Sequence, residues 1–183
     1  RSCLVGSEMC IRDRFDWGYH SVKQAQLNNR KIYFARGKGL GGTSIVNGMV
    51  YIRGVAQDYD NWRQMGLDGW GYSDLLPYFK YSEGSTNRQN KFHGNQGPLK
   101  VEPARNFSVL DEAFIKAAVD TGHEFLDDFN ANKRAGVSRI DSTTYRGVRQ
   151  SSAISYLKKV PKNLKIFTNT RVVKILFLSL IHI

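Results

Sequence analysis

Apolar residues recur at helical spacing in four stretches of the chain. In the clearest stretch, Leu110, Phe114 and Ala117 share one side of a helix. Ser108 precedes this pattern as a candidate N-cap, and Gly122 follows it as a stop. The four predicted helices cover residues 56–66, 71–83, 108–122 and about 151–160.

Short runs of β-branched and aromatic residues predict strands between these helices. Residues 30–37 lead into a glycine-rich loop, and residues 98–103 end at Pro103. Two further runs, 163–169 and 171–177, follow each other so closely that they predict a hairpin. The elements together predict a mixed α/β (α+β) fold without an internal repeat.

The two ends of the chain do not fit this pattern. Met9–Arg14 back-translates to ATG-TGT-ATA-AGA-GAC-AG and Leu178–Ile183 to CTG-TCT-CTT-ATA-CAC-ATC, which are reverse complements over most of their length. Both strings resemble the transposase end of sequencing-library adapters. We therefore expect residues 1–14 and 178–183 to be adapter-derived scars. A signal peptide is the alternative for the N-terminal segment, but that segment lacks a continuous apolar core.

Excluding these ends changes the composition in two ways. Cys3 and Cys10 both fall in the predicted scar, so residues 15–177 contain no thiol and no disulfide framework. The whole chain has 27 Lys and Arg against 16 Asp and Glu, a net charge of +11. The segment 15–177 keeps 24 basic and 14 acidic residues and a net charge of +10. No apolar run reaches the roughly 18 residues of a membrane span.

The basic excess raises the possibility of nucleic-acid binding. Lysines and arginines are spread along the chain and are not gathered in one run. Net charge bears on association and not on fold. We therefore expect no nucleic-acid partner and keep a basic nucleic-acid-binding module as the less favoured alternative.

Residues 37–49, GKGLGGTSIVNGM, match G-x-G-x-x-G at Gly37, Gly39 and Gly42. A dinucleotide fingerprint requires a βαβ unit of about 30 residues with an acid about 20 residues further on. The segment 43–55 is too short for a crossover helix and a strand, and it is interrupted by Asn47-Gly48. The context thus argues against the fingerprint. The apolar residues that follow the glycines have helix-like spacing: Ile45, Val46, Met49 and Val50.

The loop nevertheless carries the means to bind an anion. Gly41 and Gly42 allow a backbone to approach a ligand closely. Thr43 and Ser44 offer hydroxyl and N–H groups where a helix would begin, and Asn47 lies one turn further on. A tight turn capped by Thr43 is an equally good interpretation of these residues alone.

A longer stretch, residues 36–83, reads RGKGLGGTSIVNGMVYIRGVAQDYDNWRQMGLDGWGYSDLLPYFKYSE and closely resembles the first signature region of glucose–methanol–choline (GMC) oxidoreductases. The likeness continues through DWGY, HGNQGPLKV, RGVRQSSAISYL and NLKIFTNTRVVKILF, and it is strongest toward choline dehydrogenase-like alcohol dehydrogenases. The resemblance implies a fragment of a FAD-binding Rossmann-like domain together with part of the substrate domain. It implies oxidation of a small-molecule alcohol to a carbonyl by hydride transfer to FAD.

The same resemblance assigns roles to individual residues. Gly39 departs from the family, which usually has Val there, and Phe34 stands where some relatives carry a histidine that bonds FAD covalently. The cofactor is therefore expected to be non-covalent. The resemblance places Gly39, Gly41, Gly42, Thr43 and Ser44 at the FAD pyrophosphate and flavin edge, Asn47, Gly48, Met49 and Val50 beside the isoalloxazine, and Val172 near the adenine.

The resemblance assigns no catalytic residue and no metal ligand to this chain. His20, His93 and His123 do not fit the family's C-terminal histidine motif, and His93 is better explained as part of a turn. We expect residues 15–177 to be an internal fragment that, in isolation, neither binds FAD tightly nor oxidises alcohols. A catalytically dead homologue is the second alternative. The sequence leaves open the alcohol, the electron acceptor, the choice between oxidase and dehydrogenase, the oligomeric state and the compartment.

Overall fold

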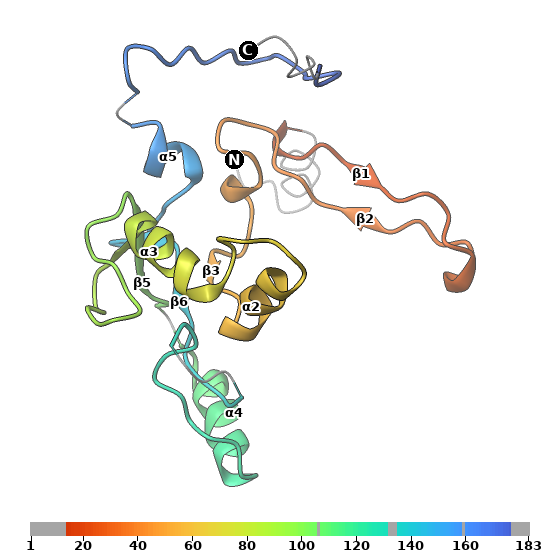
Figure 1. Cartoon of the computed structure of the whole chain (residues 1–183). Helices are drawn as coiled ribbons and strands as arrows, with labels where there is room; N and C mark the ends of the chain where they lie inside the picture. The colour runs from red at the N-terminus through yellow and green to blue at the C-terminus, as the bar shows by residue number, and fades with distance from the viewer. Residues whose placement is uncertain (1–13, 106, 132–134, 159, 177–183) are drawn as a thin grey trace, which may run out of the picture.

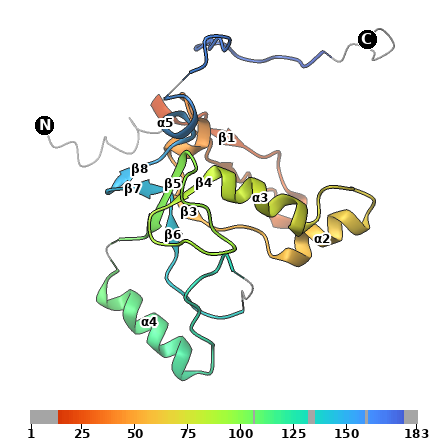
Figure 2. The same cartoon turned by 60° about the vertical axis from the view of Figure 1, so that its left-hand side comes forward.

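The computed structural model describes residues 14–105, 107–131, 135–158 and 160–176. A small sheet lies at the centre, with α2 and α3 on one side of it, α4 projecting from one end and α5 near the other (Figures 1 and 2). Apart from Arg14, the two predicted scars lie outside the described residues. In chain order the elements are β1 (Tyr19–His20), η1 (Ala25–Leu27), β2 (Tyr33–Phe34), η2 (Gly42–Ile45), β3 (Val50–Tyr51), α2 (Ala56–Gln64), α3 (Tyr72–Ser82), β4 (Glu83–Ser85), β5 (Leu99–Pro103), α4 (Val109–Asp120), β6 (Asp141–Ser142), β7 (Thr144–Tyr145), β8 (Val148–Arg149) and α5 (Ser152–Tyr156).

The central sheet has the strand order β3-β6-β5-β4. β5 is antiparallel to β6 and parallel to β4, with Val101 opposite Ser85. β5 confirms the strand predicted at 98–103, and Pro103 ends it as expected. Two separate hairpins, β1–β2 and β7–β8, flank this sheet in the chain.

The interior contains more polar than apolar side chains. Val101 and Leu126 are the buried apolar residues of the described part of the chain. Charged side chains such as Glu83, His93 and Asp141 are buried as well. Because hydrophobic stabilisation scales with the apolar area removed from water, this core depends on correct pairing of its charges.

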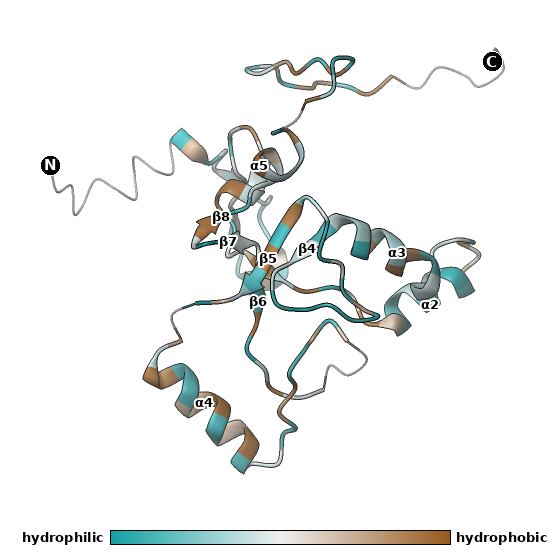
Figure 3. Cartoon of the chain, turned by 90° about the vertical axis from the view of Figure 1, so that its left-hand side faces the viewer, coloured by the Kyte–Doolittle hydropathy of each residue, from teal (hydrophilic) through white to brown (hydrophobic). Residues whose placement is uncertain are grey.

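All four predicted helices are present, although the fourth, predicted over about 151–160, extends only over Ser152–Tyr156. α2 and α3 pack on each other through Tyr59, whose ring centroid lies 5.5 Å from that of Phe79. Ser108 caps α4 as predicted, because its Oγ accepts the N–H of Asp111 at 3.2 Å. Figure 3 shows apolar and polar bands along α4, and Phe114 is 70% exposed. Among the described residues, no helix is long and apolar enough to cross a membrane.

Two local predictions were wrong. Residues 45–50 do not form a helix: a short 3-10 turn, η2, ends at Ile45, and Met49 takes a positive φ of 60° before β3 begins. The predicted hairpin at 163–177 is not formed in its described part, where residues 163–176 contain no strand. An isolated two-stranded hairpin is marginal in water, and this segment lies away from the central sheet (Figure 1), with Val173 92% exposed.

Candidate functional site

The glycine loop, residues 36–50, connects β2 to β3 and contains η2. It brings together nine of the ten residues that the resemblance assigns to FAD, from Gly39 to Val50. Val172 is the exception. It lies in the segment 160–176, is 76% exposed, and makes no described contact with the loop.

The glycines are required by the course of the backbone. Gly41 and Gly42 have φ values of 102° and 57°, in the region that strains other residues. A Cβ on Gly37 would lie 2.3 Å from the carbonyl oxygen of Gly42, so the loop folds back on itself there. At Gly39 the nearest atom to a Cβ would be Ile45 Cδ1, at 2.9 Å, which a rotation of that side chain can relieve.

The two adjacent hydroxyls have different surroundings. Ser44 Oγ donates to Gly41 O at 2.5 Å and accepts the N–H of Ser152 at 2.8 Å. Its hydroxyl is therefore used within the fold both as a donor and as an acceptor. Thr43 is exposed, and its Oγ accepts the N–H of Gly37 at 3.3 Å. Within the described residues its hydroxyl proton has no acceptor, which leaves it available to a ligand.

The second half of the loop is held by residues from far along the chain. Asn47 Oδ1 accepts the N–H of Met49 at 3.2 Å and a bond from Arg149 Nη1 at 2.8 Å. Met49 O accepts the N–H of Thr143 at 2.8 Å. Sequence reasoning missed Arg149 as a residue of this site. The family resemblance covers its stretch, RGVRQSSAISYL, but nothing there indicates a contact with a residue 102 positions away.

The outer side of the loop is open. A Cβ on Gly42 or on Gly48 would meet no atom within 4 Å, and Val50 is 51% exposed. Arg36 and Lys38 are exposed beside it and add positive charge. An exposed hydroxyl, accessible backbone and nearby cations suit an anionic group of a cofactor such as FAD. The loop contains no His, Asp, Glu or Cys side chain that could act as a general acid or base near neutral pH.

A second group of polar residues lies inside the fold. His93 Nδ1 is 2.8 Å from Glu83 Oε1, and its Nε2 is 2.7 Å from Asp128 Oδ2. Burial alone would lower the pKa of His93, but the hydrogen bonds and charges of Asp128 and Glu83 outweigh it and raise the pKa from 6.5 to about 9. Arg53 Nη2 completes the group at 2.7 Å from Glu83 Oε2. The sequence did not reveal this buried role of His93.

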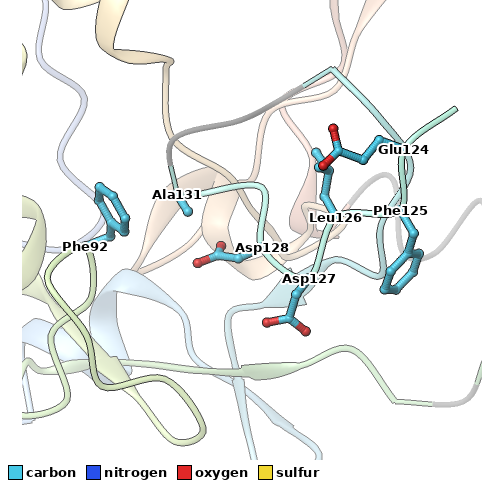
Figure 4. A pocket seen from close by; sticks show the side chains of 7 residues that line it. All are labelled: Phe92, Glu124, Phe125, Leu126, Asp127, Asp128 and Ala131. Atoms are coloured by element: carbon cyan, nitrogen blue, oxygen red, sulfur yellow. The ribbon is translucent and has the colours of Figure 1, made fainter.

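A hollow lies beside this ion cluster, between Phe92 and the segment 124–131 (Figure 4). Asp128 and Asp127 border it, but they are already paired with His93 and Arg88. Among the described residues, no group of three or more His, Cys, Asp or Glu side chains could hold a metal ion. The hollow opens at the surface, since Phe125 on its wall is 48% exposed. It is lined by Phe92, Glu124, Phe125, Leu126, Asp127, Asp128 and Ala131.

Comparison with curated proteins identifies long stretches of similarity. The oxygen-dependent choline dehydrogenase of Sinorhizobium fredii is 45% identical over 150 residues, which cover 82% of this chain and 27% of that protein. The chain thus spans about a quarter of the length of the curated relatives that it matches.

Solved structures show the same relationship. A pyridoxine 4-oxidase from Mesorbium loti matches with a TM-score of 0.74 at 32% identity, over 79% of this chain and 29% of that one. A FAD-dependent oxidoreductase from Chaetomium thermophilum matches with a TM-score of 0.71 at 30% identity, over 77% and 27%. The mixed α/β fold predicted from the sequence is confirmed by these alignments. The sequence profile of the GMC oxidoreductases matches residues 5–181, and the chain therefore belongs to the GMC oxidoreductase family.

Proposed function

We propose that this chain is part of a FAD-dependent enzyme that oxidises a small alcohol to a carbonyl. The bound flavin would supply the redox chemistry by accepting a hydride, and this chain would supply binding and orientation. The observation that carries the proposal is the glycine loop, with its open outer side and the free hydroxyl of Thr43. Its relatives include choline dehydrogenases and a pyridoxine oxidase, which supports an alcohol as the substrate class.

Within this proposal, residues 15–177 belong to a FAD-binding Rossmann-like domain and to part of a substrate domain. Thr43 and the backbone at Gly41 and Gly42 would face the pyrophosphate. Ser44 remains close to that group, although its hydroxyl is used within the fold. The role of Val172 near the adenine requires the segment 160–176 to pack differently when the cofactor-binding domain is complete. The remaining proposed contacts to FAD are Gly39, Asn47, Gly48, Met49 and Val50.

We propose non-covalent attachment of FAD because Phe34 has no nucleophilic atom for a bond to the cofactor. Phe34 lies in β2 directly before the loop. The guanidinium carbon of Arg36 lies over the Phe34 ring, 5.9 Å from its centroid. Acid precipitation of the flavin-loaded protein tests this point. All of the flavin should appear in the supernatant, whereas flavin retained in the pellet would contradict it.

The basic module and the inactive homologue remain the alternatives. Salt-sensitive binding of duplex DNA by the chain would favour the module. A full-length gene product that holds flavin but lacks the C-terminal histidine motif, and does not turn over alcohol, would favour the inactive homologue. Neither result is expected.

The direct test uses the full-length protein. Its gene is obtained by sequencing outward from the codons of residues 15 and 177, and it is then expressed. The purified protein is assayed for reduction of an electron-accepting dye with choline and with pyridoxine, the alcohols named for its relatives. Flavin-dependent dye reduction with either alcohol supports the proposal. A flavin-free, inactive protein would overturn it. The gene sequence also tests whether the two ends are adapter-derived, because residues 1–14 and 178–183 should then be absent from the gene.

A further inference from the structure

Arg149 and Ser44 connect the glycine loop to a part of the chain about 105 residues away. Arg149 Nη1 lies 2.7 Å from Asn47 O, 2.8 Å from Asn47 Oδ1 and 3.2 Å from Ser44 O. Ser44 Oγ in turn accepts the N–H of Ser152 at 2.8 Å. We call these four residues, Ser44, Asn47, Arg149 and Ser152, the loop clasp. In every one of these contacts the segment 149–152 donates and the loop accepts.

The base of the clasp is fixed independently of the loop. Arg149 ends β8, where it pairs with Thr144 of β7. Ser152 begins α5, whose N-cap Ser151 is buried and accepts the N–H of Ile154 at 3.3 Å. Because both anchors belong to regular elements, they can impose a position on the loop.

The loop needs such support. Gly37 is its one buried residue, and η2 provides a single short turn. Met49 is held at a φ of 60°, which a residue with a side chain adopts at a cost in free energy. Asn47 Oδ1 stabilises that conformation by accepting the N–H of Met49, and Arg149 holds the same oxygen in place.

We propose that Arg149 is a positioning residue that fixes the conformation in which the glycine loop faces FAD. That the ligand is FAD rests on the proposed function, whereas the clasp rests on the hydrogen bonds of Arg149 and Ser152 alone. The three acceptors of Arg149 Nη1 are neutral oxygens, so its positive charge is not cancelled by them. The clasp therefore places a full positive charge behind a loop that faces a dianionic pyrophosphate.

Three substitutions separate hydrogen bonding from charge. Arg149→Lys keeps the charge and offers three N–H donors on one nitrogen, which suits three converging oxygens. Arg149→Gln keeps a donor without the charge, and Arg149→Met keeps neither. Arg146→Met is the matched control, because Arg146 lies in the same β7–β8 hairpin and its side chain packs on the ring of Tyr145. Among the described residues, this side chain makes no hydrogen bond or ion pair with the loop.

The first test is amide hydrogen exchange of the chain without flavin. Gly42, Val46, Asn47 and Met49 have hydrogen-bonded N–H groups that report on the loop. In R149M their exchange should rise about tenfold or more, since bonds to a charged group are lost. R149K should recover most of the protection, R149Q should recover less of it, and R146M should match the parent. Unchanged loop exchange in R149M, or an equal rise in R146M, would overturn the clasp.

Amides of β5 serve as the reference for global unfolding. If R149M loses protection there as well, R149Q replaces it, because it removes the charge and keeps one donor. Faster exchange confined to the loop in R149Q that is reversed in R149K supports the proposal, and an unchanged loop in R149Q contradicts it.

The second test measures flavin retention in the full-length protein. R149M should release FAD about tenfold faster than the parent. R149K should restore both retention and the shape of the flavin absorption spectrum, and R149Q should retain FAD less well than R149K. Equal retention in R149M and the parent would refute the positioning role. If the parent binds no flavin but R149M still loosens the loop, the proposed function fails and the clasp stands.

Discussion

His93 should make the stability of this chain depend on pH between about 6.5 and 9. Its pKa is about 9 in the folded chain, against 6.5 for an ordinary histidine. A group with a raised folded pKa stabilises the fold fully below its unfolded pKa, and this contribution is lost as the pH rises through the folded pKa. The rise of the pKa from 6.5 to about 9 corresponds to about 3 kcal/mol of free energy of unfolding.

The size of this effect follows from the position of the ring. The His93 side chain is fully buried, and each ring nitrogen faces a carboxylate, Glu83 on one side and Asp128 on the other. Loss of the proton leaves one ring nitrogen without a hydrogen opposite a buried anion. The fold then contains a repulsive contact in place of a bond.

Urea unfolding followed by tryptophan fluorescence, repeated from pH 6 to pH 9.5, measures this dependence. The parent should lose about 3 kcal/mol across the range, and His93→Gln should lose most of this slope. His123→Gln, at an exposed histidine, is the matched control and should behave like the parent. An imidazole NMR titration of His93 with a midpoint near 6.5, or an unchanged slope in H93Q, would refute the reasoning.

Three further predictions follow from single contacts. Arg53→Met should lower the free energy of unfolding by about 3 kcal/mol in urea titrations, since buried Glu83 loses its guanidinium partner and keeps only His93 as a cation among the described residues; a loss below 1 kcal/mol would show that the Arg53–Glu83 pair is not desolvated. Ser108→Ala should destabilise α4 by about 1 kcal/mol, measured by hydrogen exchange of its amides, whereas unchanged exchange would mean that the cap contributes nothing. Gly37→Ala should speed exchange in the glycine loop because its Cβ would lie 2.3 Å from a backbone oxygen, and retained protection would contradict the close approach.

The helices could be predicted from the sequence because their signals are local. Ser108 and the apolar face that follows it define α4 within one short stretch, and the pattern at 56–66 defines α2 in the same way. The strand at 98–103 was equally visible, since a run of strand-forming residues ends at a proline.

The errors occurred where the outcome depends on partners. Residues 163–177 have the composition of strands, but strands form only where a sheet accepts them, and the described part of this segment has none beside it. The spacing of Ile45 and Met49 favours a helix. Asn47 Oδ1 instead accepts the N–H of Met49, and this local bond competes with the helical hydrogen bonds.

The sequence predicts which segment forms the candidate site. It does not predict which hydrogen bonds form within that segment. The glycines, Thr43 and Ser44 stand together in the sequence, and the family resemblance marked them. Nothing local distinguishes the free hydroxyl of Thr43 from the committed hydroxyl of Ser44. Arg149 lies in a stretch that the resemblance covers, but nothing in the sequence connects it to the glycine loop, because a contact over about 100 residues exists only after folding.

The flavin content of the full-length protein tests the central claim most directly. The account predicts an absorption spectrum of bound flavin, about one FAD per chain released by acid, and bleaching of that spectrum when an alcohol substrate is added without oxygen. A full-length protein that folds, contains residues 15–177 and yet binds no FAD would contradict the account.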